Sequence, residues 1–201
     1  MIEKISYNLA NVLKNEKVIT QEEFEVYDYG IQITLANLVN CIIVVLVGIT
    51  FHAEVEAVIF YCSFVSLRYF CGGYHANSYR KCFLLFLLTC MSCITFSKYI
   101  ASYGVEIVKT GSFLVADIWL GINIFRKAPI ADGNRQASIE EKAMCRRKSI
   151  YLYIFWSGVG IILWRLGQVR MQSCLISTFI AVSILMIQGK GGSKRNEKER
   201  T

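Results

Sequence analysis

The chain has 201 residues, of which 54% are hydrophobic, with one proline and a formal net charge of +7. Its mean hydropathy of +0.42 is too high for an ordinary soluble domain, so we expect a membrane protein in contact with the lipid bilayer. Basic and aromatic residues do not alternate in a pattern typical of nucleic-acid binding, so no nucleic-acid partner is expected.

The first thirty residues are polar and rich in glutamate, so no cleavable signal peptide is expected. Within them, Met1–Lys14 places apolar residues on one helical face, which predicts an amphipathic helix on the membrane surface; a short cap packed on the bundle is the alternative. Thr20 and Glu23 have the spacing of a capping box, which predicts the start of a helix that continues into the first membrane span.

Six apolar runs follow, each near the length that a helix needs to cross a bilayer. They predict an all-α, polytopic membrane protein with about six transmembrane helices and an N-terminal amphipathic helix. Residues 1–188 are expected to form a single integral membrane domain, and residues 189–201 a basic, disordered cytoplasmic tail. The predicted spans are Ile31–Phe51, Val55–Phe70, Cys82–Ile100, Val105–Phe125, Ile150–Leu166 and Gln172–Gln188.

The distribution of basic residues predicts the orientation of these spans. If six helices cross the membrane, only Lys98, Lys109, Arg165 and Arg170 lie on the side away from the termini, so 18 of the 22 Lys and Arg residues share the side of the termini. Because basic segments stay in the cytoplasm during insertion, both termini and the loop Arg126–Lys148 are expected there. The localisation expected is a cell membrane, with a multi-pass chain.

Most of the eight cysteines have positions that favour a packing role, because five lie inside apolar runs where a thiol acts as a small hydrophobe. Cys90 and Cys93 match a C-x-x-C spacing, but no second ligand pair or histidine is near, so neither a metal site nor a cofactor is expected. Cys145 lies beside Arg146 and Arg147, a setting that favours reactivity but supplies no base.

Cys71 and Cys82 bracket His75 between two apolar runs, and this cluster is the candidate site. Cys82 is preceded by two basic residues and starts a predicted helix, and both features favour a thiolate. Seven residues of straight helix would separate it from His75 by about 10 Å, so the segment must bend. Gly72 and Gly73 permit that bend. Cys71 ends an apolar run and ranks second; a membrane-proximal basic loop explains the basic residues but not His75.

These residues resemble a known signature. The stretch "RYFCGGYHANSYRKC" looks like that of the accessory gene regulator B family of bacterial membrane cysteine peptidases, which process quorum-sensing propeptides. Upstream, "EVYDYG" (Glu25–Gly30) resembles the family's entry to its first span. Downstream, Lys127–Ser149 resembles its proline-containing polar loop and the basic helix that follows.

The resemblance implies that Cys82 is the nucleophile and His75 its general base, with Arg68, Gly72 and Gly73 needed for the shape of the site or for substrate handling. Cys71 departs from the usual family pattern, so a minor role or its oxidation with Cys82 stays open. No acidic third member is evident; Asn77 suits either an orienter of the histidine or a turn.

The resemblance also implies the reaction. The protein would remove the C-terminal tail of an AgrD-like precursor peptide and cyclise the signal segment as a thiolactone or lactone, without a cofactor, on the cytoplasmic side. A homodimer is implied by the resemblance alone. The alternatives are a peptide transporter or exporter without catalytic activity and, with weaker support, a metal-binding or redox protein. Asp117 is the clearest charged residue inside a predicted span.

Overall fold

The computed structural model describes residues 2–72, 79–103, 106–129 and 138–198. These residues form seven α-helices and no strand, which confirms the all-α prediction for the described part of the chain. The helices are α1 (Ile2–Asn15), α2 (Phe24–Thr50), α3 (Glu54–Cys71), α4 (Tyr79–Tyr103), α5 (Glu106–Lys127), α6 (Ile139–Arg165) and α7 (Val169–Lys198).

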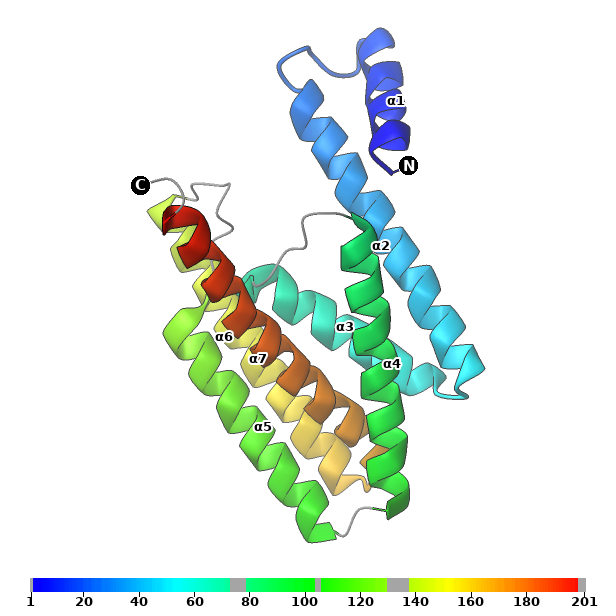
Figure 1. The fold of residues 1–201 in the computed structure, drawn as a ribbon, viewed down its shortest axis with the longest axis vertical. Coiled ribbons are helices and arrows are strands. Elements are labelled where there is room, and N and C mark those ends of the chain that lie inside the picture. Colours follow the sequence, from blue (N-terminus) through cyan, green and yellow to red (C-terminus); the bar gives the residue numbers. More distant parts are fainter. Residues whose placement is uncertain (1, 73–78, 104–105, 130–137, 199–201) are drawn as a thin grey trace.

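Helix α7 is the centre of the bundle, and α3, α4, α5 and α6 all pack against it (Figure 1). Every residue from Gln172 to Phe179 is buried, as expected for a helix surrounded by other helices. Helix α2 lies outside this group, against α3 and α4, and α1 folds back on α2. The C-terminal ends of α2, α4 and α6 point toward one end of the molecule, and those of α3, α5 and α7 toward the other.

The prediction of six spans requires correction. Within the described residues, three helices are long and apolar enough to cross a membrane, over Phe24–Thr50, Lys81–Ser102 and Val169–Gln188. The other three predicted spans correspond to α3, α5 and α6. These helices contain polar residues, to which a search for apolar runs gives too little weight. Helix α3 carries Glu54, Glu56 and Arg68, α5 carries Asp117 near its middle, and the first half of α6 carries Lys142 and the run Arg146–Lys148. These apolar helices are consistent with a helical membrane protein.

The hydrogen bonds of the capping box predicted at Thr20 are present, in the turn just before α2, whose N-cap residue is Glu23. Thr20 donates its backbone N–H and its hydroxyl to the Glu23 carboxylate, both at 2.9 Å, and the Glu23 N–H donates to Thr20 Oγ1 at 3.3 Å. These hydrogen bonds from Thr20 hold the pKa of the exposed Glu23 carboxyl below its ordinary value. Ser138 and Glu141 form the same reciprocal pair at the start of α6. The pair at Ser138 satisfies N–H groups that the start of α6 leaves without intrahelical partners.

The helix predicted over Met1–Lys14 is present as α1. Ser6 and Ala10 are buried, and the Tyr7 ring meets the Phe24 ring of α2 edge-on at 5.4 Å. Leu9 and Val12, by contrast, are exposed. The helix therefore combines packing on α2 with an uncovered apolar face, and its contact with the membrane surface stays a prediction.

Helix α7 continues to Lys198, ten residues beyond the predicted end of the last span at Gln188. The backbone is thus helical over most of the segment that the sequence predicts to be a disordered tail. The division into a membrane domain and a cytoplasmic tail stays a prediction.

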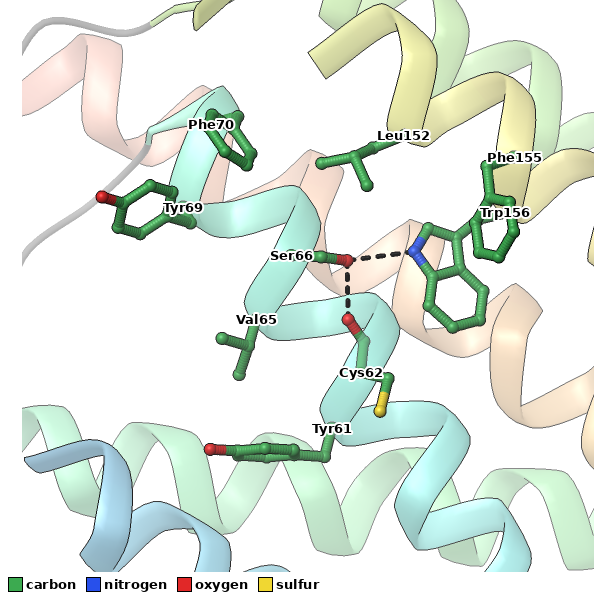
Figure 2. Close-up of a pocket in the computed structure, with 9 residues that line it drawn as sticks. All are labelled: Tyr61, Cys62, Val65, Ser66, Tyr69, Phe70, Leu152, Phe155 and Trp156. Atoms are coloured by element: carbon green, nitrogen blue, oxygen red, sulfur yellow. Dashed lines mark hydrogen bonds between the residues drawn. The ribbon is translucent and has the colours of Figure 1, made fainter. Parts of the chain in front are cut away.

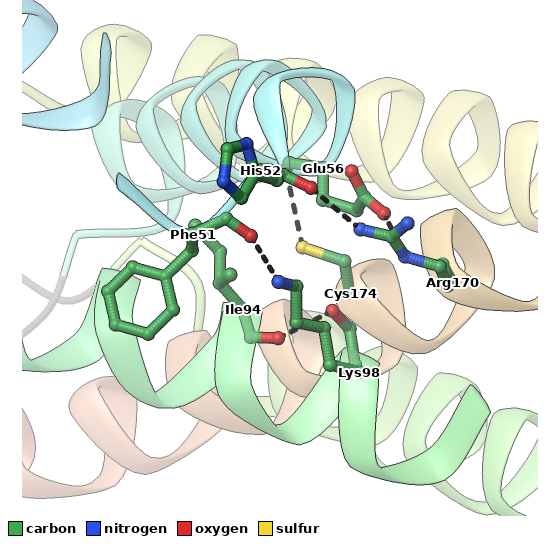
Figure 3. Close-up of polar contacts among 8 residues, drawn as sticks. Phe51, His52, Glu56, Ile94, Lys98, Arg170 and Cys174 are labelled. Carbon is green, nitrogen blue, oxygen red and sulfur yellow. Dashed lines mark hydrogen bonds and ion pairs between the residues drawn. The ribbon is translucent and has the colours of Figure 1, made fainter. Parts of the chain in front are cut away.

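The end of the molecule that holds the α2–α3 turn is fixed by polar contacts (Figure 3). Arg170 of α7 pairs with the buried Glu56 carboxylate at 2.7 Å and donates to the His52 carbonyl at 3.0 Å. Lys98 of α4 donates to the Phe51 carbonyl. The turn between α2 and α3 is therefore held by the last part of α4 and the first turn of α7.

Candidate functional site

At the opposite end of the bundle, the structure brings together two residues of the predicted site. Arg68 lies in the last turn of α3, and Cys82 lies in the first turn of α4. The two side chains are close enough for the guanidinium and the sulfur to interact electrostatically. Both are half-buried. A cation therefore lies beside the thiol that the resemblance predicts to be the nucleophile.

A cluster of aromatic rings packs next to Arg68 and Cys82. Phe64 and Phe86 lie one helical turn from Arg68 and Cys82 respectively, and their rings meet at 5.7 Å. The Arg68 guanidinium lies 5.9 Å from the centre of the Phe64 ring, within the range of a cation–π contact. Phe60 continues the cluster, with its ring 5.2 Å from that of Phe64. The three phenylalanines are buried, so they fix α3 against α4 directly under the site.

The start of α4 also lies close to Cys82. Helix α4 begins at Tyr79, so Cys82 belongs to its first turn, the end of a helix whose dipole favours negative charge. Its neighbour Lys81 is exposed. The sulfur of Cys82 therefore lies at a helix start as well as beside Arg68.

Gly72 ends α3 in a conformation that needs glycine. Its φ is 72° and its ψ is −161°, and its N–H donates to the Arg68 carbonyl at 3.1 Å. A side chain in this region of backbone space is strained, because the Cβ would collide with the flanking peptide groups. The sequence-based expectation that Gly72 shapes the site thus has a physical reason in the backbone, although its role in the chemistry stays a prediction.

Cys71 is placed differently from Cys82. Its side chain is fully buried at the end of α3, and burial raises the pKa of its thiol to about 11, with the nearby Ser149 hydroxyl of α6 offsetting the shift only in part. A thiol with this pKa is almost entirely protonated at neutral pH. Cys71 is therefore a packing residue in this structure, in agreement with its lower rank from the sequence.

Three predicted site residues, Gly73, His75 and Asn77, lie outside the described residues. The distance between the His75 ring and the Cys82 sulfur therefore stays a prediction. The part of the chain that the structure describes holds all eight cysteines, and all are free thiols. In that same part, no group of three or more His, Cys, Asp or Glu side chains is arranged to hold a metal ion.

Sequence reasoning missed the residues that connect the site to its surroundings. Lys148 of α6 lies over the Phe70 ring at 5.2 Å, so the basic start of α6 lies beside the end of α3. Phe64 was also missed, although its position four residues before Arg68 was the available signal. The contact with Phe86 had no such signal, because it depends on how α3 packs on α4.

Asp117, the charged residue in the fourth predicted span, is already satisfied by its neighbours. Ser157 donates to Asp117 Oδ1 at 2.5 Å, and the Tyr153 hydroxyl lies 3.0 Å from Asp117 Oδ2. These bonds join α5 to α6. The contacts of Asp117 explain it as a polar link between two helices.

The comparisons with known proteins agree with the sequence signature. The pattern of the family described as Accessory gene regulator B matches residues 6–188. This chain belongs to that family. The accessory gene regulator B family is involved in the processing of quorum-sensing peptides, which implies a propeptide substrate and association with a membrane.

Two curated proteins of the accessory gene regulator B type are similar along nearly their whole length. An AgrB-like protein of Clostridium perfringens (strain SM101, type A) is 26% identical over 190 residues, which cover 91% of this chain and 88% of the relative. AgrB-like protein 2 of Clostridium perfringens (strain 13, type A) is 27% identical over 204 residues, covering 92% and 95%. No solved structure matches this chain.

Proposed function

We propose that this protein is a membrane cysteine endopeptidase that removes the C-terminal tail of an AgrD-like propeptide and cyclises the signal segment. The observation that carries the proposal is the position of the Cys82 sulfur at the start of α4, within electrostatic range of the Arg68 guanidinium. Family membership supports the substrate class. A peptide exporter without catalytic activity would not require a half-buried thiol next to a cation and a helix start.

In the first step, His75 accepts the proton of the Cys82 thiol, and the sulfur attacks the peptide carbonyl at the junction of signal and tail. The tetrahedral oxyanion collapses, the C–N bond breaks, and His75 returns the proton to the leaving amine of the tail. An acyl-thioester on Cys82 remains. Arg68 stabilises the sulfur anion before the attack, and Gly72 gives the chain the turn that leads from α3 toward His75.

In the second step, a thiol within the signal segment gives its proton to His75 and attacks the thioester carbonyl. A new thioester bond closes the ring, the bond to Cys82 breaks, and the Cys82 sulfur recovers the proton. The product is a thiolactone; a serine hydroxyl in place of the thiol gives a lactone. Ring closure competes well with hydrolysis because the bound peptide holds its nucleophile near the acyl carbon, which gives it a high effective molarity.

We further propose that the site end of the bundle faces the cytoplasm. Arg68, Lys81 and the run Arg146–Lys148 lie at this end, whereas Arg165 and Arg170 lie at the other. Basic residues concentrate on the cytoplasmic side of membrane proteins. A homodimer stays a proposal that rests on the family alone.

The decisive experiment co-expresses the chain with its precursor peptide and follows tail cleavage by mass spectrometry. Cys82→Ser and His75→Ala are expected to abolish cleavage, whereas Cys71→Ser, the matched control, retains it. Cleavage that persists in Cys82→Ser contradicts the proposal and favours transport without catalysis.

A second experiment tests the intermediate itself. A precursor whose internal Cys is replaced by Ala cannot close the ring, so the acyl-enzyme is expected to accumulate as a covalent adduct of the protein with the signal segment. Hydroxylamine is expected to release this adduct, because it cleaves thioesters. An adduct on any residue other than Cys82, or one that resists hydroxylamine, contradicts the mechanism.

A further inference from the structure

A groove runs along α3 toward the end of the bundle that holds the candidate site (Figure 2). Its volume is about 480 Å³, and one wall is α3 while the other is α6. The lining is almost entirely apolar and aromatic, and it includes Val65, Leu152 and Phe155. The groove opens outward, since Tyr69 is 74% exposed and Phe155 is 59% exposed. It is therefore a surface groove, available to whatever surrounds the protein.

Two polar side chains of the lining, Trp156 and Ser66, already have hydrogen-bond partners. The Trp156 indole N–H donates to Ser66 Oγ at 3.0 Å, and the Ser66 hydroxyl donates to the Cys62 carbonyl at 2.6 Å (Figure 2). A polar ligand would find no free donor or acceptor among these groups. An apolar chain loses nothing by lying over them, because their hydrogen bonds are internal to the protein.

The groove ends at a positive charge. Lys148 of α6 holds its ammonium group 5.2 Å from the centre of the Phe70 ring, and Phe70 belongs to the lining. On α6, Lys148 continues the face of Leu152 and Phe155, because residues four and seven apart lie on one side of a helix. The site therefore has a long apolar part and a cation at one end.

An anionic phospholipid has the matching chemistry. We propose that the groove between α3 and α6 binds an acyl chain of an anionic phospholipid, with the phosphate of that lipid paired to Lys148. Helices α3 and α6 both pack on α7, a candidate membrane span, so the groove is formed by helices that adjoin such a span. Basic pockets between membrane helices commonly select anionic headgroups. Tyr69, with its apolar ring and polar tip, suits the boundary between chains and headgroups.

The test uses Trp156 as the reporter. The chain has three tryptophans, so the double substitution Trp119→Phe/Trp164→Phe leaves Trp156 alone in the groove. This protein is reconstituted in two kinds of phosphatidylcholine vesicle. One kind contains brominated phosphatidylglycerol, and the other contains the same fraction of brominated phosphatidylcholine; in both, the bromine is on the acyl chains. Bromine quenches indole fluorescence only at close range. We expect brominated phosphatidylglycerol to occupy the groove about fivefold more than brominated phosphatidylcholine does. This factor is the effect of one basic residue near an anionic headgroup.

Variants of two lysines on α6 separate the groove from general charge. Lys148→Gln is expected to remove the preference, and Lys148→Arg to keep it. Lys142→Gln changes the same helix on a different face and is expected to leave quenching unchanged. Circular dichroism verifies that each variant is folded. Added inorganic phosphate is expected to have no effect, because the apolar chain supplies much of the binding.

Three results overturn the proposal. The first is equal quenching by the two brominated lipids, and the second is a preference that survives Lys148→Gln. The third is the absence of quenching by either lipid, since the groove is then covered by protein, such as a second copy of the chain. None of these results bears on cleavage by Cys82, so the lipid site and the proposed function fail or stand separately.

Discussion

The Arg68 guanidinium lies 5.9 Å from the centre of the Phe64 ring and interacts electrostatically with the Cys82 sulfur. The two partners belong to different helices, and Phe64 also contacts α4 through Phe86. Arg68 is thus held by the same aromatic contact that packs α3 on α4. The charge beside the sulfur therefore depends on helix packing as well as on the arginine itself.

Replacing Arg68 is expected to slow the reaction of Cys82 with an alkylating reagent. In Arg68→Gln the positive charge is lost, and the thiolate is less stable relative to the thiol. For a half-exposed pair the interaction is about 1 kcal/mol, which corresponds to a rate change of about fivefold at pH 7.5. The rate is measured by mass spectrometry of the peptide that contains Cys82. Arg165→Gln, at the other end of the bundle, is the matched control; an equal effect of both variants contradicts the assignment.

Phe64→Leu is expected to slow alkylation of Cys82 although no charge changes. The substitution removes the ring that holds Arg68 and contacts Phe86, so Arg68 is no longer fixed beside the sulfur. Stability is expected to fall by about 1 kcal/mol, as for other conservative core changes. Phe113→Leu alters a buried ring of α5 and is the control: it lowers the melting temperature while the alkylation rate stays unchanged. If both variants slow alkylation alike, Phe64 has no specific role.

Cys71 is expected to resist alkylation at neutral pH in the folded protein. With its pKa raised to about 11 by burial, only on the order of one thiol in a few thousand is ionised at pH 7.5. Because burial raises the pKa of this thiol, the reactivity of Cys71 increases as the pH rises toward 11. The measurement compares modification at Cys71 and Cys82 at pH 7.5 and 9.5 in one sample. Modification of Cys71 as fast as Cys82 at pH 7.5 contradicts the structure.

Much of the helical framework could be predicted from the sequence, because helix starts and apolar runs are local features. The reciprocal pair of Thr20 and Glu23 follows from residue types three positions apart, and its hydrogen bonds are present in the turn before α2. The number of membrane spans was not predictable in this way. Glu56 and Asp117 are satisfied by Arg170 and by Ser157, partners from other helices that a search along one segment does not consider.

The candidate site shows the same division. Cys82 and Arg68 were identifiable from the residue types and from the resemblance, and Gly72 from its place at the end of an apolar run. The ring of Phe64 under Arg68 and the ammonium of Lys148 over Phe70 depend on the crossing of α3 with α4 and α6. Such contacts between distant segments are set by packing, which has no period in the sequence.

Gly72→Ala is expected to destabilise the protein and to reduce tail cleavage. At φ 72° and ψ −161° an alanine costs about 1–3 kcal/mol of backbone strain, which the chain relieves by shifting the end of α3. Gly158→Ala is a suitable control, because Gly158 lies inside α6 with nothing within 4 Å of an added Cβ. It is expected to be neutral or slightly stabilising. Melting temperature and cleavage are measured for both; equal melting temperatures contradict the strain argument.

Arg170→Gln is expected to destabilise the end of the bundle away from Cys82. Glu56 is 5% exposed and pairs with Arg170 at 2.7 Å, so removal of the guanidinium leaves a buried carboxylate without its cation. A buried group that loses its partner costs about 1–3 kcal/mol, and the half-exposed Arg170 favours the lower part of this range. The double variant Glu56→Gln/Arg170→Gln removes both charges and is expected to recover part of the loss. Melting temperatures of the single and double variants give the coupling between the two residues.

A double variant less stable than Arg170→Gln alone means that the ion pair is not the reason for the loss of stability. In that case the hydrogen bond from Arg170 to the His52 carbonyl holds the α2–α3 turn instead.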